Sequence, residues 1–350
     1  MPIIANSDLP SFKRIQTEGE VVLSKEIASK QDIRGLNFGI LNMMPDAALE
    51  ATERQFLRLI GGSQVVQLYV FPFTLKTIER SKNAKNHIDK YYYDFEKIKN
   101  MGLDGLIITG AGVDGENIKK QKFYQELEQV VSWAVENVAS TLCSCLATHA
   151  VMEMKFQQKR HKMPKKYWGV FHHNITEFKH PLLSGINSDF AVPHSRYNEI
   201  TASQFTDADI KILIKSDSGV HMAISPDLLK IVFFQGHPEY DTISLLKEYK
   251  REMILSIKND TKYPVFPDNY LSKQAKAILL EFKDKLLNME FTIDDFPEKL
   301  LSPMLSNTWS ANTKIIISNW IGLIYQTTNV DVKKQFMDGL SAENPLNLKV

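Results

Sequence analysis

Two short motifs in the sequence carry residue types that together could perform nucleophilic catalysis. Cys145 follows an apolar run at 139–144 that is typical of a buried strand, and residues 146–154 directly after it have a helical pattern. A thiol at such a junction would project from the sheet edge, with helix N–H groups directed at its substrate. A thiol nucleophile needs a base and the base needs an orienting group, which the motif His237-Pro238-Glu239 could supply. This combination indicates acyl transfer or hydrolysis by a cysteine.

The elements expected to position these motifs alternate between strands and helices in the first half of the chain. Apolar runs predict buried strands, and the spacing of apolar residues between them predicts helices. The strands are expected at 36–44, 65–71, 103–112 and 139–145, and the helices at 48–60, 123–137 and 146–154. This alternation favours an α/β fold with a parallel sheet that is covered on both faces.

The pattern changes after Lys162 to closely spaced strands, which we expect to be antiparallel or mixed. These strands are expected at 167–178, 190–200, 210–216, 220–225 and 231–236, before helices at 242–258, 272–288 and 310–326. The whole pattern predicts an N-terminal arm over residues 1–34, a catalytic domain over 35–330 and a C-terminal tail over 331–350.

Composition and charge exclude several classes of partner. The 42 basic and 41 acidic residues nearly cancel, so nothing favours binding to nucleic acid or to an acidic membrane surface. No apolar run approaches the roughly 18–20 residues that span a bilayer, and the N-terminus lacks a signal-peptide pattern. Cys143 and Cys145 are too close for an ordinary disulfide, which favours a reducing, cytoplasmic compartment. No spacing of His and Cys matches a metal-ligand frame, so we expect no metal site.

Several motifs spread along the chain identify a family resemblance. They are Leu41–Pro45, Glu53–Leu59, Asp104–Ala111, Pro193–Tyr197, Gly236–Asp241 and the pair Asn319-Trp320, together with Ser140-Thr141-Leu142 before the cysteine. In combination they resemble the homoserine O-acyltransferases of methionine biosynthesis, the homoserine O-succinyl/acetyltransferase family. The resemblance implies a flavodoxin-like, class I glutamine amidotransferase-like parallel sheet with flanking helices and a partly antiparallel C-terminal portion.

The resemblance also implies roles for individual residues. Cys145 would accept the acyl group from an acyl-CoA co-substrate, His237 would be the general base, and Glu239 would hold the imidazole. The backbone N–H of Leu146 would stabilise the oxyanion. No cofactor besides the acyl-CoA is expected.

Three further residues match family positions that bind substrate. Arg251 would bind the α-carboxylate of the acceptor, while Lys166 and Ser195 match other residues of the family's active site. Arg251 also lies in a run of charged residues that could be a solvated helix face, and Lys166 could be a surface lysine. Members of the family commonly form homodimers, a property that this sequence alone does not decide.

The acyl donor is expected to depend on the loop after residues 109–111. In the resembled family an acidic residue there accompanies acetyl transfer and glycine accompanies succinyl transfer, and alignment places Asp114 at this position. A carboxylate would repel the free carboxylate of a succinyl group. We therefore expect acetyl-CoA rather than succinyl-CoA, and a homoserine O-acetyltransferase-like enzyme.

The acceptor is open at this point. The resemblance makes L-homoserine the expected hydroxy amino acid, but residues 46–48 and 146–149 depart from the family pattern near the pocket. These departures leave two alternatives. The first is the same chemistry with another acceptor, such as L-serine or a specialised metabolite. The second is a cysteine amidase or hydrolase that releases the acyl group to water.

Overall fold

The computed structural model describes residues 2–62, 66–113, 115–186 and 189–348. Within these ranges eleven strands form one sheet. They are β1 (Ile3–Ala5), β2 (Val22–Ser24), β3 (Leu36–Met43), β4 (Leu68–Phe73), β5 (Gly105–Ala111), β6 (Ser140–Ser144), β7 (His161–Ile175), β8 (Asp189–Glu199), β9 (Lys211–Ser216), β10 (Gly219–Ile224) and β11 (Ile231–Phe234).

The strand order is β2-β1-β4-β3-β5-β6-β11-β10-β9-β7-β8. The central strands β4, β3, β5, β6 and β11 are parallel, and taken in chain order they have the 2-1-3-4-5 arrangement of flavodoxin-like sheets. From β11 through β10, β9 and β7 to β8 the pairing is antiparallel. The predicted α/β fold, with a parallel sheet and a partly antiparallel later portion, is therefore confirmed.

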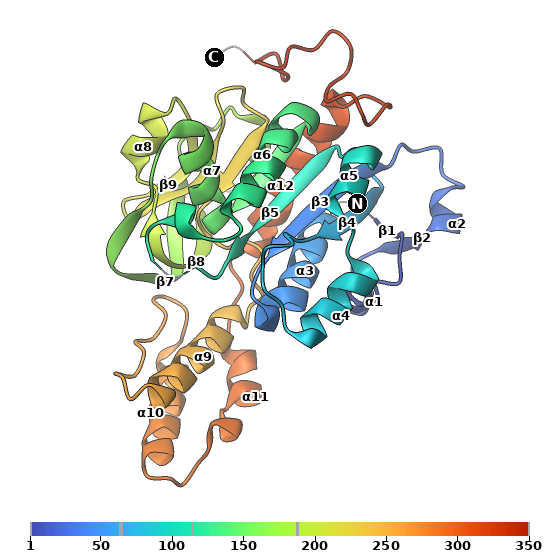
Figure 1. Cartoon of the computed structure of the whole chain (residues 1–350). Coiled ribbons are helices and arrows are strands. Elements are labelled where there is room, and N and C mark those ends of the chain that lie inside the picture. The colour runs from blue at the N-terminus through green and yellow to red at the C-terminus, as the bar shows by residue number, and fades with distance from the viewer. Residues whose placement is uncertain (1, 63–65, 114, 187–188, 349–350) are drawn as a thin grey trace.

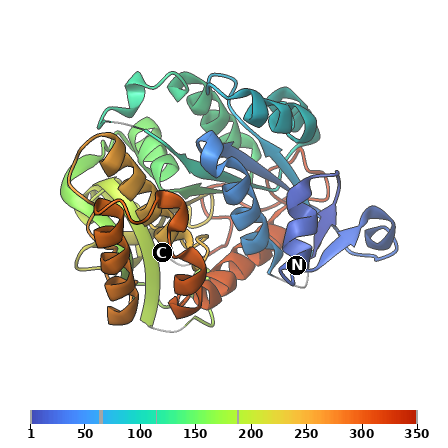
Figure 2. The same cartoon turned by 90° about the horizontal axis from the view of Figure 1, so that it is seen from below.

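Helices cover both faces of this sheet (Figures 1 and 2). They are α1 (Pro10–Thr17), α2 (Lys25–Ala28), α3 (Asp46–Gly61), α4 (Lys82–Tyr91), α5 (Phe95–Met101), α6 (Tyr124–Asn137), α7 (Leu146–Phe156), α8 (Ala202–Asp207), α9 (Ser244–Lys258), α10 (Lys273–Leu287), α11 (Glu298–Leu301) and α12 (Ser310–Thr327). Short 3-10 turns occupy Ile118–Lys120, Pro181–Leu183, Ile293–Asp295 and Ser302–Met304. The side chains of α1, α3 and α12 fill one core, and those of α5, α6, α7 and α8 fill the other. No helix in the described ranges combines the length and apolar character that crossing a membrane requires.

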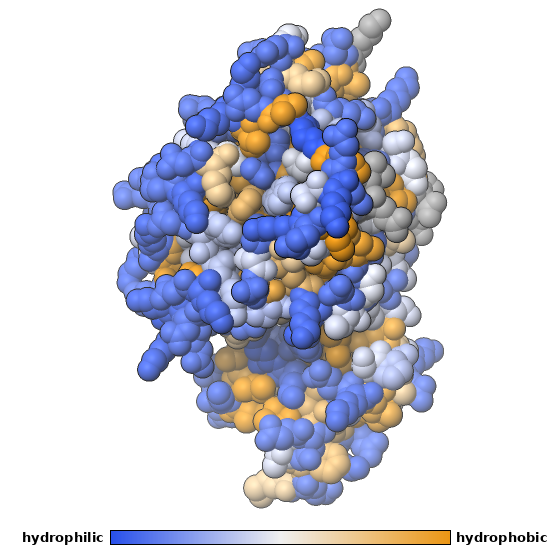
Figure 3. All heavy atoms as spheres, turned by 90° about the vertical axis from the view of Figure 1, so that its right-hand side faces the viewer, coloured by the Kyte–Doolittle hydropathy of each residue, from blue (hydrophilic) through white to orange (hydrophobic). Residues whose placement is uncertain are grey.

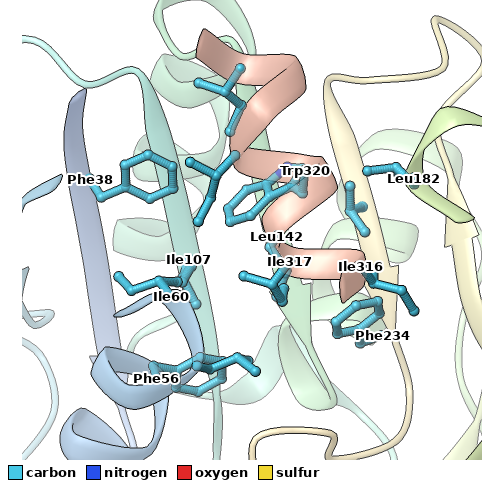
Figure 4. Close-up of a cluster of buried hydrophobic side chains, with 14 of the residues drawn as sticks. Phe38, Phe56, Ile60, Ile107, Leu142, Leu182, Phe234, Ile316, Ile317 and Trp320 are labelled. Carbon is cyan, nitrogen blue, oxygen red and sulfur yellow. The ribbon is translucent and has the colours of Figure 1, made fainter. Parts of the chain in front are cut away.

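The core beneath α12 is organised around Trp320 (Figure 4). Its side chain is 1% exposed, and its ring meets Phe38 of β3 edge to face with centroids 5.5 Å apart. The indole Nε1 donates a hydrogen bond of 2.7 Å to Ser140 Oγ at the start of β6. Trp320 therefore joins the last helix to the strand that leads to Cys145.

Replacing Trp320 with alanine is expected to lower the free energy of unfolding by about 3–5 kcal/mol, because it leaves a large cavity in the core. Trp320→Phe keeps most of the apolar contact and loses the hydrogen bond to Ser140, so it should cost about 0.5–1.5 kcal/mol. Equilibrium denaturation in urea measures both. A Trp320→Ala loss below 1 kcal/mol would contradict this view of the core.

A separate helical lobe, made of α9, α10 and α11, lies beneath the sheet in Figure 1. It has its own apolar core, in which Leu246, Met253 and Phe282 pack together with Trp168 of β7. The sequence-based division did not separate this lobe from the catalytic domain.

The two ends of the chain also pack against the sheet. In the segment predicted as an arm, β1 pairs with β4, and Ile3 and Ile4 are buried. In the segment predicted as a tail, Phe336 is buried and Gln335 donates to the carbonyl oxygens of Val135 and Val138. The boundaries at residues 34 and 330 remain predictions.

Candidate active site

Cys145 occupies a strained junction between β6 and α7. Its φ of 51° and ψ of −108° are unfavourable for a residue with a side chain, and such strain typically costs about 1–3 kcal/mol. Its N–H donates to Phe234 O of the neighbouring β11 at 2.7 Å, which holds the sharp turn in place. The structure therefore places Cys145 at the predicted strand–helix junction, half-buried, while Cys143 is fully buried in the strand.

The base and its orienting carboxylate come from the end of β11, the strand beside β6. His237 Nδ1 lies 2.8 Å from Glu239 Oε1, and the His237 N–H donates to Pro193 O of β8 at 2.7 Å. The Tyr240 ring stacks on the imidazole with centroids 4.4 Å apart. With Nδ1 engaged by the carboxylate, the other ring nitrogen of His237 remains available to Cys145, whose charge raises the pKa of the imidazole.

The charges in this group favour the protonated form of His237. Burial would lower the pKa of His237, but the Cys145 thiolate and the Glu239 carboxylate outweigh it and raise that pKa well above its ordinary value. For Cys143, which has no such partner, burial raises the pKa of the thiol. Because the thiolate is the nucleophilic form of cysteine, Cys145 is the sulfur that the site can activate.

The expected oxyanion donor lies next to the thiol. Leu146 is the first residue of α7, where a backbone N–H has no acceptor within the helix. Gly110 of β5 closes the other side, since a Cβ placed there would lie 3.7 Å from the Cβ of Cys145. The carbonyl oxygen of a bound thioester could therefore meet the start of α7 directly beside the attacking sulfur.

Two arginines of α3 hold the segment that carries the base. Arg54 and Arg58 both form ion pairs with Asp241, which follows the His-Pro-Glu motif. Gln55 adds a hydrogen bond of 3.2 Å to Asp241 Oδ2, and Arg58 Nη2 reaches the Glu239 carbonyl oxygen at 3.5 Å. Through these contacts α3 holds the segment that follows His237 and so helps to fix the position of the imidazole.

The change Asp241→Asn is expected to lower kcat about tenfold, because an uncharged side chain holds the two guanidinium groups less firmly and the imidazole gains freedom. The free energy of unfolding should fall by about 1–3 kcal/mol. Steady-state kinetics and urea denaturation test this, with Asp284→Asn on the exposed face of α10 as the matched control. Equal kinetics for Asp241→Asn and the control would contradict a positioning role.

The predicted substrate residues Lys166 and Ser195 meet at a carboxylate that the sequence analysis did not select. Glu248 of α9 accepts hydrogen bonds of 2.6 Å from Ser195 Oγ and from the Tyr240 hydroxyl. Lys166 Nζ lies 3.9 Å from Glu248 Oε2 and 3.1 Å from Glu252 Oε1. Lys166 is thus a mostly buried cation packed over the Trp168 ring, not a free surface lysine.

Arg251 is a predicted substrate residue that the structure does not bring into this group. Arg251 lies one turn after Glu248 on α9, but its side chain is 60% exposed and contacts Glu252 at 3.7 Å. Asp114 lies outside the described residues. Glu248, with a side chain only 12% exposed, was not selected from the sequence, where it stands among Lys247, Lys250 and Arg251.

These groups lie at the carboxyl ends of the parallel strands, where ligands bind in sheets of this type. Figure 3 shows the molecular surface hollowed between the larger sheet-containing part and the helical lobe beneath it. Near the ends of β3 and β5 the surface has a cavity of about 790 Å³ bordered by Met43, Pro45 and Ala111. Within the described residues, no group of three or more His, Cys, Asp and Glu side chains is arranged to hold a metal ion.

Comparison with known proteins identifies the family of the chain. The family model described as HTS: Homoserine O-succinyltransferase matches residues 2–330. The chain belongs to the homoserine O-succinyltransferase family. A homoserine O-succinyltransferase of Nitrosococcus oceani is 49% identical over 355 residues, covering 100% of this chain and 99% of its own. One from Allochromatium vinosum is 50% identical over 356 residues, covering 99% of both chains.

Solved structures similar to this member of the homoserine O-succinyltransferase family include two glutamine amidotransferases. One, from Thermotoga maritima, is 9% identical with a TM-score of 0.42 and covers 83% of this chain and 99% of its own. The other, from Methylobacillus flagellatus, is 11% identical with a TM-score of 0.44 and covers 83% of this chain and 95% of its own.

Membership of the homoserine O-succinyltransferase family makes the chain an acyltransferase and corrects the expected donor. The preference for acetyl-CoA is wrong, because the family and the relatives above are named for succinyl transfer. The prediction rested on the single charge of Asp114. It took no account of the buried Arg160, whose guanidinium donates to the carbonyl oxygens of Gly115 and Glu116 in the same loop.

Proposed function

We propose that this chain transfers the succinyl group of succinyl-CoA to the hydroxyl of L-homoserine through a thioester on Cys145. The names of the family and of its relatives support the acyl group and the acceptor. The observation that carries the proposal is the geometry of Cys145 at the start of α7, beside a His237 imidazole held 2.8 Å from Glu239. The reaction needs no cofactor besides the acyl-CoA co-substrate.

In the first half-reaction the Cys145 thiolate attacks the thioester carbonyl of succinyl-CoA. The carbonyl oxygen takes up negative charge, which the N–H of Leu146 stabilises. The tetrahedral intermediate then breaks its bond to the sulfur of CoA, and the His237 imidazolium gives its proton to that leaving thiolate. One thioester is exchanged for another, so the step is nearly isoenergetic.

In the second half-reaction the neutral His237 removes the proton from the hydroxyl of homoserine. The oxygen attacks the enzyme thioester, the intermediate expels the Cys145 thiolate, and O-succinylhomoserine leaves. The proton that stays on His237 restores the starting ion pair. Glu239 keeps the imidazole in the same orientation through both half-reactions.

The acceptor pocket is proposed to include Glu248, next to Lys166 and Ser195. The Glu248 carboxylate suits the ammonium group of an amino acid, and its contact with Tyr240 places it beside the ring that stacks on His237. Lys166, and Arg251 after a change of rotamer, are the cations proposed for the α-carboxylate of the acceptor. Such a pocket favours an amino acid over water or a simple alcohol.

The change Glu248→Gln is expected to raise KM for L-homoserine about 10- to 100-fold, because a neutral amide loses a charge-assisted hydrogen bond to the ammonium group. Acylation of Cys145 by succinyl-CoA should be nearly unchanged, since the donor has no ammonium group. Glu290→Gln on the exposed surface of the helical lobe is the control. A Glu248→Gln variant with unaltered KM for homoserine would remove Glu248 from the acceptor site.

The whole proposal is tested by the mass of the intact protein after brief exposure to succinyl-CoA. We expect a single succinyl adduct, located on Cys145 by peptide mapping, which L-homoserine discharges within one turnover. L-Serine and buffer should leave the adduct in place on that timescale. Discharge by buffer alone would indicate a hydrolase, discharge by L-serine would change the acceptor, and no adduct would refute the thioester route.

A further inference from the structure

A buried arginine lies beside the loop that follows β5. Arg160 comes immediately before β7, and its side chain is turned back across the loop, 7% exposed. Its Nε donates to Glu116 O at 3.0 Å and its Nη2 donates to Gly115 O. Both hydrogen-bond partners are neutral carbonyl groups. Among the described residues the Glu153 and Glu116 carboxylates act on the guanidinium through their charge, without a hydrogen bond to it.

This guanidinium also lies near the nucleophile. The loop that Arg160 holds begins at the end of β5, where Gly110 lies against Cys145. Burial lowers the pKa of Arg160, and the strongest opposing influence on that pKa is the Cys145 thiolate. The arginine is therefore a buried cation on a loop that begins beside Cys145, and its Nη1 has no hydrogen-bond partner among the described residues.

A succinyl group on Cys145 carries a carboxylate two methylene groups beyond the thioester carbonyl. A carboxylate that leaves water for such a site needs a cation or several donors within reach. Planar guanidinium groups suit this purpose because they bind a carboxylate through two parallel hydrogen bonds. Succinyl-CoA as acyl donor is therefore best served by a cation close to Cys145 that has no carboxylate partner of its own.

Arg196 is the other arginine influenced by the Cys145 thiolate, and its contacts argue against it. Its Nη1 lies 3.6 Å from the carboxylate of Glu199 and donates to Asn198 O at 3.2 Å. Its guanidinium is also packed over the Tyr167 ring, 5.0 Å from the centroid. Arg196 thus has a carboxylate partner, although its Nη2 is buried without a hydrogen-bond partner. Among the described residues Arg160 donates hydrogen bonds only to carbonyl oxygens.

We propose that Arg160 binds the terminal carboxylate of the succinyl group and thereby selects succinyl-CoA over acyl donors that end in a methyl group. This inference rests on the proposed function, because it requires the acyl group to be carried on Cys145. Arg160 is then a specificity-determining residue that also supports the loop through Gly115 and Glu116.

The test compares succinyl-CoA with butyryl-CoA, which has nearly the same length and lacks the carboxylate. In Arg160→Gln, kcat/KM for succinyl-CoA should fall about 100-fold, the loss typical of removing one member of a buried charge pair. For butyryl-CoA the change should stay within about fivefold, so that the ratio between the donors collapses. Lys159→Gln removes the same charge at an exposed neighbouring residue and should leave the ratio unchanged.

Two results would overturn the inference about Arg160. One is an equal fall for both donors, which would limit Arg160 to supporting the loop. The other is a kcat/KM that stays at the wild-type value for both donors. If Arg160→Gln does not fold, the same comparison is made with Arg160→Lys. A lysine keeps the charge but cannot form the two parallel hydrogen bonds, so the ratio of kcat/KM for succinyl-CoA to that for butyryl-CoA should fall about tenfold. A constant ratio in Arg160→Lys would likewise overturn the inference.

The wild-type enzyme separates this inference from the proposed function. An unmodified Cys145 after exposure to succinyl-CoA, or an adduct that homoserine does not discharge, would refute the proposed function and the inference with it. A wild-type enzyme that forms and transfers the succinyl adduct, with a donor ratio that Arg160→Gln leaves intact, would refute the inference alone.

Discussion

Replacing Cys145 with alanine is expected to lower kcat for succinyl transfer by about 10⁴-fold or more, because no other group can carry the acyl intermediate. The fold should survive, since the side chain is small and only half-buried. Alanine also keeps the same unfavourable positive φ, so the free energy of unfolding should change little. Transfer is measured by the release of CoA in the presence of L-homoserine, and the adduct by the mass of the intact protein.

The matched control is Cys143→Ala, two residues earlier on the same strand. Cys143 is fully buried in the core between the sheet and α7, and burial raises the pKa of its thiol, so it is unsuited to nucleophilic attack. Its loss should leave most of the activity and cost about 1 kcal/mol of stability. Retained transfer in Cys145→Ala together with lost transfer in Cys143→Ala would overturn the assignment of the nucleophile.

The second large effect is expected from Glu239→Gln, which should lower kcat by about 10²- to 10⁴-fold. The amide no longer stabilises an imidazolium, and it also weakens the preference for the tautomer with a proton on Nδ1. Because Glu239 is one of the groups that raise the pKa of His237, its removal lowers that pKa. The imidazolium is then lost at a lower pH than in the wild type.

The direction in which the His237 pKa shifts can be determined from the rate of Cys145 acylation measured as a function of pH. The basic limb of the pH profile, where the imidazolium that protonates the departing CoA is lost, should move to lower pH in Glu239→Gln. Glu248→Gln is the comparison within the same site, because Glu248 contacts Tyr240 and Ser195 rather than the imidazole. It should alter KM for homoserine and leave the basic limb of acylation in place. A basic limb that does not move in Glu239→Gln would contradict the proposed role.

Much of the central sheet could be predicted because its strands are almost wholly apolar. The strand predicted at 36–44 corresponds to β3 (Leu36–Met43), and the helix predicted at 242–258 corresponds to α9 (Ser244–Lys258). The short elements were missed for a physical reason. β1 has only three residues and α8 six, so neither contains enough residues for a period to be recognised.

The candidate site divides in the same way between local and long-range features. The junction at Cys145 and the His-Pro-Glu motif are local patterns, and the structure places both as predicted. The contact of Gln55 with Asp241 joins residues 186 positions apart, and no local pattern reveals it. Glu248 was not selected because charged residues surround it in sequence, whereas contacts with β7 and β8 decide which of them is buried.

The position of β6 beside β11 has a consequence for how a newly made chain becomes active. Thr148 Oγ1, in the first turn of the helix after β6, donates to Phe234 O of β11, 86 positions later, and the chain between them includes β7 to β10. Closing so long a loop is slow compared with forming a helix or a hairpin. The nucleophile therefore emerges from the ribosome long before its base, and the supporting helix α12 follows later still. Enzymatic activity should be one of the last properties that the growing chain acquires.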